Sequence, residues 1–175
     1  MGCRFQVTAG AAVFYPVLYF FDSTGWFSAL LPAVIAHEAG HALALRCCGS
    51  SIQTLRLEVT GLCMECSELF HPQMEAICAA AGPAAGLLWV WIMDWFPGEW
   101  PQLSKELSLG LSLFNLLPVL PLDGGRILLA LTGREELILW AGRLCSVSLA
   151  IMALGLQQWT LLLPAAVILL CQIRA

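Results

Sequence analysis

Long apolar stretches dominate the chain, and short polar segments separate them. Six such stretches cover residues 7–21, 26–45, 75–93, 104–120 with a continuation to 131, 137–156 and 159–173. A helix needs about 20 residues to cross the hydrocarbon core of a bilayer, and most of the stretches approach that length, although the first is short. The pattern predicts an all-α polytopic membrane protein with about six transmembrane helices.

A sizeable polar insertion, residues 48–72, follows the second stretch. Apolar and polar side chains alternate over residues 51–59, which is typical of a short strand. Thr60-Gly61 then indicates a turn, and residues 62–66 can form a return strand. The sequence therefore predicts a small β-hairpin insertion after the second transmembrane helix. An edge of this hairpin can pair with an extended peptide, but the spacing fits a plain surface hairpin equally well.

The composition agrees with a membrane protein. Hydrophobic residues make up 59% of the chain, charged residues make up 11%, and the mean hydropathy is +0.81. A typical globular domain has about 25% charged residues and about 45–50% apolar residues. We therefore expect most of the protein's apolar surface to face the lipid bilayer. The net charge of -4 gives no basic footprint, so nucleic acid is not an expected partner.

Basic residues predict the orientation of the chain. Lysine and arginine concentrate in the cytoplasmic loops of membrane proteins. With a cytoplasmic N-terminus, Lys105 lies outside, Arg143 lies within the fifth stretch, and the other basic residues lie on or near the cytoplasmic side: Arg4, Arg46, Arg56, Arg126, Arg134 and Arg174. We therefore expect both termini to be cytoplasmic.

The second apolar stretch contains the motif His37-Glu38-Ala39-Gly40-His41. On a helix, residues four apart share one face, so the two imidazoles can bind one zinc ion. Glu38 lies beside them, close enough to act on a water at that ion. Ionisable groups are costly inside an apolar segment, and zinc binding with proton transfer gives them a function. The motif predicts a membrane-embedded zinc protease.

A catalytic zinc site usually has three protein ligands and one open position. Asp123 is the best candidate for the third ligand, because Pro118 and Pro121 break the fourth apolar stretch just before it. Broken helix at membrane depth is tolerated where it lines a polar cavity. Alternatively, Asp123 is a turn residue in a loop outside the bilayer and does not bind zinc. His71 is a rival ligand, although its place next to Pro72 suggests a loop residue.

Three motifs together resemble the site-2 protease family, which are intramembrane zinc metalloproteases of peptidase family M50. The motifs are His37-Glu38-x-x-His41, Gly82-Pro83 and Asn115-x-x-Pro118-x-x-Pro121-Leu122-Asp123-Gly124-Gly125-Arg126. The resemblance covers roughly residues 30–131. It implies that His37, His41 and Asp123 hold Zn²⁺ and that Glu38 is the general base. It also implies that Asn115 orients the substrate or polarises its carbonyl.

The resemblance also implies a function and an organisation. The chain looks most like the compact sporulation-type members, which process a membrane-associated precursor of a sigma factor. We therefore expect a membrane-associated protein substrate, an inhibitory membrane partner and a bacterial cell membrane. We expect residues 1–175 to form one domain, with a catalytic core at about 26–131 and accessory spans at 7–21 and 137–173.

Two other functions fit parts of the sequence. A non-catalytic membrane protein that binds membrane segments has no use for a base such as Glu38 beside a metal. A zinc transporter could use the two histidines together with Cys63 and Cys66, which have the spacing of half a zinc site. It needs ligands spread along a path through several helices, whereas here they cluster. No second cysteine pair accompanies the first, so we expect free thiols.

Overall fold

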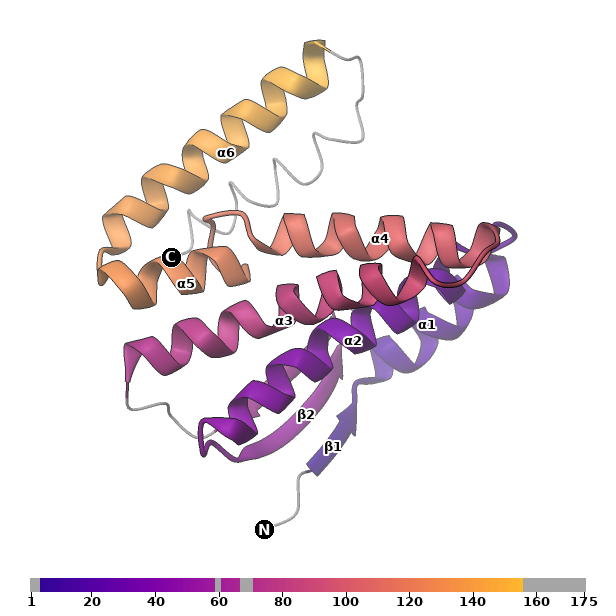
Figure 1. Ribbon diagram of the computed structural model, residues 1–175, viewed down its shortest axis with the longest axis horizontal. Coiled ribbons are helices and arrows are strands. Elements are labelled where there is room, and N and C mark those ends of the chain that lie inside the picture. The colour runs from indigo at the N-terminus through magenta and orange to yellow at the C-terminus, as the bar shows by residue number, and fades with distance from the viewer. Residues whose placement is uncertain (1–3, 59–60, 67–70, 156–175) are drawn as a thin grey trace.

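The computed structural model describes residues 4–58, 61–66 and 71–155 and is mostly helical (Figure 1). Its elements are β1 (Arg4–Val7), α1 (Ala9–Phe21), α2 (Trp26–Cys47), β2 (Ile52–Glu58), β3 (Gly61–Cys66), α3 (Pro72–Met93), α4 (Glu99–Asn115), α5 (Asp123–Thr132) and α6 (Glu135–Gly155). Helix α3 lies at the centre and packs against α2, α4 and α5, and α2 also packs against α4. Helix α6 contacts α5 and extends away from this core.

The predicted helices that fall within the described residues are found, but six membrane spans are not shown. In the described part of the chain, α2 and α3 are long and apolar enough to cross a membrane, and α1 is a shorter apolar helix. The fourth stretch forms two helices, because α4 ends at Asn115 and α5 begins at Asp123. This break was expected from Pro118 and Pro121. The sixth predicted stretch, residues 159–173, lies outside the described residues.

The predicted hairpin is confirmed, and it belongs to a three-stranded sheet of order β1-β2-β3. Strands β2 and β3 pair antiparallel, with Arg56 opposite Cys63. Strand β1 pairs parallel to β2, with Phe5 opposite Leu55. We did not predict β1, because it has four residues and its partner lies about fifty positions away. A pairing between such distant segments leaves no local pattern in the sequence.

Thr8, which caps α1, and Tyr15 within α1 connect this helix to the sheet. The Thr8 hydroxyl accepts a hydrogen bond from Ala11 N at 3.3 Å, which caps α1, and donates one to the Leu57 carbonyl at 3.1 Å. The Tyr15 hydroxyl donates to the Glu58 carbonyl at 2.9 Å. Both carbonyls belong to β2, so the position of the sheet is tied to α1.

The start of α2 is held by a carboxylate in the preceding loop. Asp22 Oδ2 accepts a hydrogen bond from Phe27 N at 2.6 Å, and Asp22 Oδ1 accepts one from the Thr24 hydroxyl at 2.7 Å. The hydroxyl of Thr24 lowers the pKa of the Asp22 carboxyl below its ordinary value. An anion at a helix N-terminus satisfies backbone N–H groups and complements the helix dipole. This contact fixes where the histidine-bearing helix begins.

Buried serines of α4 bind this helix to its neighbours. The Ser104 hydroxyl donates to the Ala29 carbonyl of α2 at 2.8 Å and accepts from Trp89 Nε1 of α3 at 3.0 Å. The Ser108 hydroxyl donates to the Gly86 carbonyl of α3 at 2.9 Å. Small and hydroxyl-bearing residues allow helices to approach closely and to hydrogen-bond across their interface in membranes. These bonds keep α2, α3 and α4 in a fixed arrangement.

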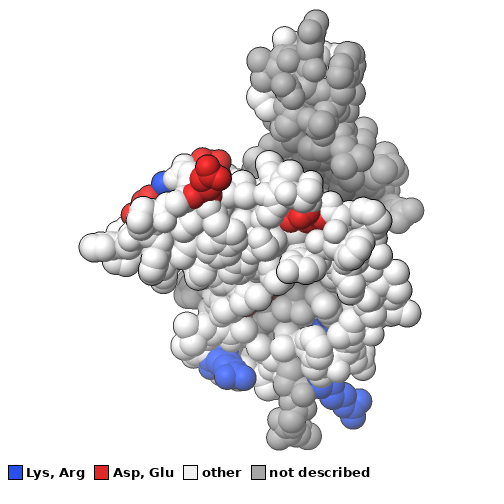
Figure 2. Space-filling model, turned by 90° about the vertical axis from the view of Figure 1, so that its right-hand side faces the viewer, with Lys and Arg blue, Asp and Glu red and all other residues white. Residues whose placement is uncertain are grey.

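The surface is largely uncharged. In the face shown in Figure 2, acidic side chains lie in its upper half, where a basic side chain lies beside some of them, and further basic side chains lie in its lower half. Large apolar side chains are exposed on several helices, among them Phe20, Phe21, Ile77, Trp91 and Leu144. A soluble monomer seldom exposes so much apolar surface, whereas contact with lipid requires it.

We predict that Ser104→Ala destabilises the protein by about 1 kcal/mol, because it removes an interhelical hydrogen bond and leaves the Ala29 carbonyl without it. The matched control is Ser112→Ala on the same face of α4, since the Ser112 hydroxyl is fully buried and has no described hydrogen-bond partner. Thermal unfolding in detergent should show a lower midpoint for the first variant and an unchanged or higher one for the second. Equal midpoints would contradict this account of the helix contacts.

Candidate metal centre

Helix α2 places His37 and His41 side by side toward the interior. The two residues are 4% and 8% exposed, and their Nε2 atoms lie 3.2 Å apart. His41 Nδ1 lies 2.7 Å from the Cys78 carbonyl oxygen of α3. A carbonyl can only accept, so His41 donates through Nδ1, which leaves the lone pair of Nε2 free for a metal.

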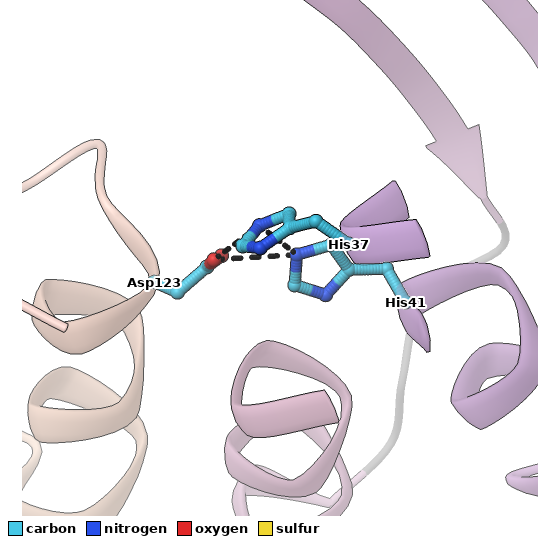
Figure 3. A group of neighbouring side chains, drawn as sticks. All are labelled: His37, His41 and Asp123. Carbon is cyan, nitrogen blue, oxygen red and sulfur yellow. Dashed lines mark hydrogen bonds and ion pairs between the residues drawn. The ribbon is translucent and has the colours of Figure 1, made fainter. Parts of the chain in front are cut away.

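Asp123, the first residue of α5, completes the group from the opposite side (Figure 3). Its Oδ2 atom lies 3.1 Å from His37 Nε2 and 3.2 Å from His41 Nε2. Asp123 is 6% exposed, and its Oδ2 has no hydrogen-bond partner among the described residues. The three side chains therefore converge on one point from segments far apart in the sequence, and they can hold a metal ion.

The separations among these three atoms fit zinc. Tetrahedral ligands at about 2.0–2.1 Å from a zinc ion lie roughly 3.3 Å from one another. The three observed separations are 3.1, 3.2 and 3.2 Å. Two imidazoles and one carboxylate also form a known catalytic donor set, which leaves a fourth position open. The unpartnered Asp123 Oδ2 atom is then explained as a ligand atom rather than as an unsatisfied buried acceptor.

Helix α3 supports the histidines from behind through its small residues. A Cβ atom at Gly82 would overlap the His41 ring, and one at Gly40 of α2 would overlap the Ala81 carbonyl oxygen. A Cβ atom at Gly86 would overlap the Ser112 hydroxyl of α4. Gly82 and Gly86 therefore allow two different helices, α2 and α4, to approach α3 closely. The Gly-Pro motif thus serves the metal centre by leaving room for a ligand.

The break between α4 and α5 places Asp123 by tight backbone packing. A Cβ atom at Gly124 would overlap the Leu116 carbonyl, and one at Gly125 would overlap the backbone of Val119. Val119 is 1% exposed, so this loop is part of the packed interior. The two glycines after Asp123 therefore allow α5 to begin directly against the loop that precedes it.

A cavity of about 520 Å³ opens beside the three side chains. It is bounded by the ligand-bearing faces of α2 and α5, by the end of α4, by strand β3 and by the start of α3. Its lining residues are His37, Glu38, His41, Leu45, Gly61, Leu62, Cys63, Met64, Cys66, Cys78, Asn115, Pro121, Asp123 and Arg126. The cavity is large enough for an extended peptide segment beside the metal-binding residues.

Of the other residues singled out in the sequence, Glu38 and Asn115 line the cavity and His71 does not. Glu38 is half-buried in the cavity wall and has no hydrogen bond among the described residues, and Asn115 lines the same cavity while its Nδ2 donates to the Leu111 carbonyl at 3.0 Å. His71, the rival ligand, is exposed at the start of α3 and lies outside the metal-binding group. The sequence assigned no role to Arg126, although its position three residues after Asp123 places both on one helix face.

Residues 8–122, which are more than half of the chain, match the family described as peptidase M50B-like. The chain belongs to this family. The family includes the site-2 proteases, which are integral membrane proteins. The two apolar helices α2 and α3 of this M50B family member agree with that location.

Individual relatives agree with the family. A protein of Synechocystis sp. that is named as a zinc metalloprotease is 31% identical over 109 residues, which are 57% of this M50B chain and 29% of that protein. Rip3 of Mycobacterium tuberculosis, also named as a zinc metalloprotease, is 31% identical over 141 residues, which are 70% of this chain and 35% of that protein. The matched region thus spans about a third of the length of these relatives.

A solved structure shows the same fold. The site-2 protease from Methanocaldococcus jannaschii superposes with a TM-score of 0.67 and 22% sequence identity, over 99% of this M50B chain and 91% of that one. The similarity extends beyond the region that matches the family sequence, so α6 takes part in the shared fold.

We predict that Gly82→Ala reduces zinc affinity about 10–100-fold, the range found when a group that orients a metal ligand is disturbed. The new methyl group would displace the His41 ring, which must remain close to Asp123. The control is Gly110→Ala in α4, where an added Cβ meets no atom within 4 Å. Zinc competition with a chelator measures both variants, and equal affinities would contradict the proposed contact.

Proposed function

We propose that this chain is an intramembrane zinc metalloendopeptidase that hydrolyses a peptide bond within or next to a membrane segment of a protein substrate. The single observation that carries the proposal is the convergence of His37, His41 and Asp123 beside Glu38 in one cavity. These potential ligands form a single cluster rather than a path across the described helices. That arrangement favours a reaction centre over a transport route.

His37, His41 and Asp123 are the proposed zinc ligands. Their donor types, their separations and the partner of His41 Nδ1 support this assignment. When bound, zinc supplies Lewis acidity, which polarises a carbonyl and lowers the pKa of a coordinated water. The three residues are buried, and burial strengthens their electrostatic interactions.

Glu38 is the proposed general base and acid. It follows His37 directly on α2 and lines the cavity, so its carboxylate lies on the side where water and substrate must meet. Because no described residue hydrogen-bonds to it, the carboxylate can take a proton from the attacking water. It then returns that proton to the amide nitrogen as the peptide bond breaks.

Asn115 is proposed to orient the substrate. One N–H of its side-chain amide is used by the Leu111 carbonyl, which fixes the amide at the end of α4. The second N–H and the side-chain oxygen have no described partner and lie in the cavity wall. They can hydrogen-bond to the backbone of an extended peptide and polarise the carbonyl that is attacked.

Strand β3 is proposed to hold the substrate extended. Within the described sheet β3 is an edge strand that pairs with β2 alone, and Leu62, Cys63, Met64 and Cys66 line the cavity. In a helical peptide the backbone carbonyls accept hydrogen bonds within the helix, so the peptide must unwind before a carbonyl can be attacked. Pairing with an edge strand replaces those hydrogen bonds by new ones to the backbone of β3.

The cellular setting is proposed on the same basis. We infer six transmembrane helices in a single domain, with the catalytic core at about 26–131 and both termini in the cytoplasm. Arg46 in the last turn of α2 and Arg56 in β2 support a cytoplasmic position for the sheet. A bacterial cell membrane, a sigma-factor precursor as substrate and an inhibitory membrane partner complete the proposal, and they rest on the family resemblance.

We predict that Glu38→Gln lowers the cleavage rate by about 10²–10⁴-fold while zinc binding is kept, because the amide cannot accept the proton of the attacking water. Cleavage of a tethered membrane substrate in detergent and the zinc content of the same sample provide the two measurements. Glu106→Gln is the matched control, since Glu106 lies on α4 and does not line the cavity. Undiminished cleavage by Glu38→Gln would refute its assignment as the base.

We predict that Asp123→Asn lowers the zinc content well below one ion per chain, because a neutral amide is a much weaker zinc ligand than a carboxylate. Asp94→Asn is the control, since Asp94 pairs with Lys105 away from the cavity. Metal analysis of the two purified variants measures the zinc content of each. An unchanged zinc content in Asp123→Asn would show that the third ligand lies elsewhere.

A further inference from the structure

Arg126 lines the cavity beside the metal-binding residues, and the proposed hydrolysis assigns it no role. It lies on α5 one turn after Asp123, so both side chains extend from one face of the helix. Its guanidinium carries a positive charge beside the metal-binding residues, and an anionic partner would stabilise that charge. The question is which group that partner is.

Asp123 does not fully satisfy the guanidinium. Arg126 Nη1 lies 3.9 Å from Asp123 Oδ1, which is longer than a hydrogen bond, while the other oxygen of Asp123 faces the two histidines. The Arg126 side chain is 41% exposed and makes no hydrogen bond among the described residues. Most of its five N–H donors are therefore available to a ligand in the cavity.

The charge of the cavity favours an anionic ligand. Among the residues that line it, Glu38 and Asp123 are acidic, and Arg126 is the single lysine or arginine. A bound Zn²⁺ balances the two carboxylates, so Arg126 leaves the loaded cavity with a net positive charge. Low-dielectric walls strengthen the attraction of such a cavity for an anion.

We propose that Arg126 binds a carboxylate of the substrate next to the peptide bond that is cut. The planar fork of a guanidinium matches a carboxylate through two parallel hydrogen bonds. An extended chain advances about 3.3–3.6 Å per residue, and Nη1 lies 3.9 Å from a ligand residue's oxygen, so the carboxylate belongs within one or two residues of the bond. This inference rests on the proposed function.

Two sources can supply this carboxylate. One is an Asp or Glu side chain of the substrate, which would make Arg126 a determinant of sequence specificity. The other is the new C-terminal carboxylate that hydrolysis creates, which would make Arg126 a product-binding residue. The chemistry of recognition is the same in both cases, so the experiment has to separate them.

The test measures binding to a zinc-loaded Glu38→Gln protein in detergent, which is not expected to cleave its ligand. The probe is a fluorescent leucine- and alanine-rich peptide in three versions. The first has a central Glu and an amidated C-terminus, and the second has Gln in place of that Glu with the same amidated C-terminus. The third is the Gln peptide with a free C-terminal carboxylate. Fluorescence anisotropy gives each affinity. Adding Arg126→Gln should weaken at least one carboxylate-bearing version about tenfold or more and leave the amidated Gln version unchanged.

Arg126→Lys should retain part of the preference, because it keeps the charge and loses the fork. The control Arg134→Gln lies beyond the end of α5, outside the cavity, and should change no affinity. An effect on the Glu version assigns the carboxylate to a substrate side chain, and an effect on the free-terminus version assigns it to the product.

If the zinc-loaded Glu38→Gln protein, in which Arg126 is unchanged, binds all three peptides with equal affinity, the proposal is overturned. A loss of zinc from Arg126→Gln would overturn it as well, because Arg126 would then act by holding Asp123 in place. Failure of the unmodified protein to cleave any membrane substrate would instead refute the hydrolase function. That failure leaves the binding measurement intact, so the two conclusions can be separated.

Discussion

The approach of the Asp123 carboxylate to two histidine nitrogens is the interaction on which the rest of the structure depends. Removing an acid and two imidazoles from water is expensive, and the cost is offset only if the three groups meet a common partner. Their atoms lie 3.1–3.2 Å apart although they come from α2 and from the start of α5. The surrounding helices must therefore be positioned to within a fraction of an ångström.

Small residues and buried hydroxyls achieve this positioning. Lipid offers no hydrophobic driving force between helices, so their contacts must come from close packing and hydrogen bonds. Gly82 makes room for the His41 ring, while Ser104 and Ser108 bind α4 to both of its neighbours. The metal-binding side chains are thus held by rigid helices rather than by loops, except at the broken segment before Asp123.

Much of this arrangement could be predicted from the sequence, because the informative signals are local. The spacing of His37 and His41 defines a helix face, and the prolines before Asp123 mark a break in a helix. These two facts made His37, His41 and Asp123 the leading candidates, and the family resemblance implied the same three residues. The hairpin followed from the alternation of its side chains in the same way.

The rest depends on contacts between distant segments. Strand β1, near the N-terminus, pairs with β2 about fifty residues later. Helix α4 begins at Glu99, five residues before the apolar stretch that predicted it. Cys78 contributes through its backbone carbonyl, which any residue possesses, so no side-chain pattern could mark it as the partner of His41. Arg126 was visible in the sequence, but its freedom from Asp123 depends on a distance that only the structure gives.

The parallel pairing of β1 has a consequence for how the sheet can be extended. Because β1 covers one border of β2, the hydrogen-bonding groups on that side are already occupied. The other border of β2 is occupied by β3, and β3 is the edge strand whose residues line the cavity. The strand at the beginning of the chain thus makes β2 the central strand and leaves β3 as the edge strand beside the cavity, although β1 contributes no residue to the cavity lining.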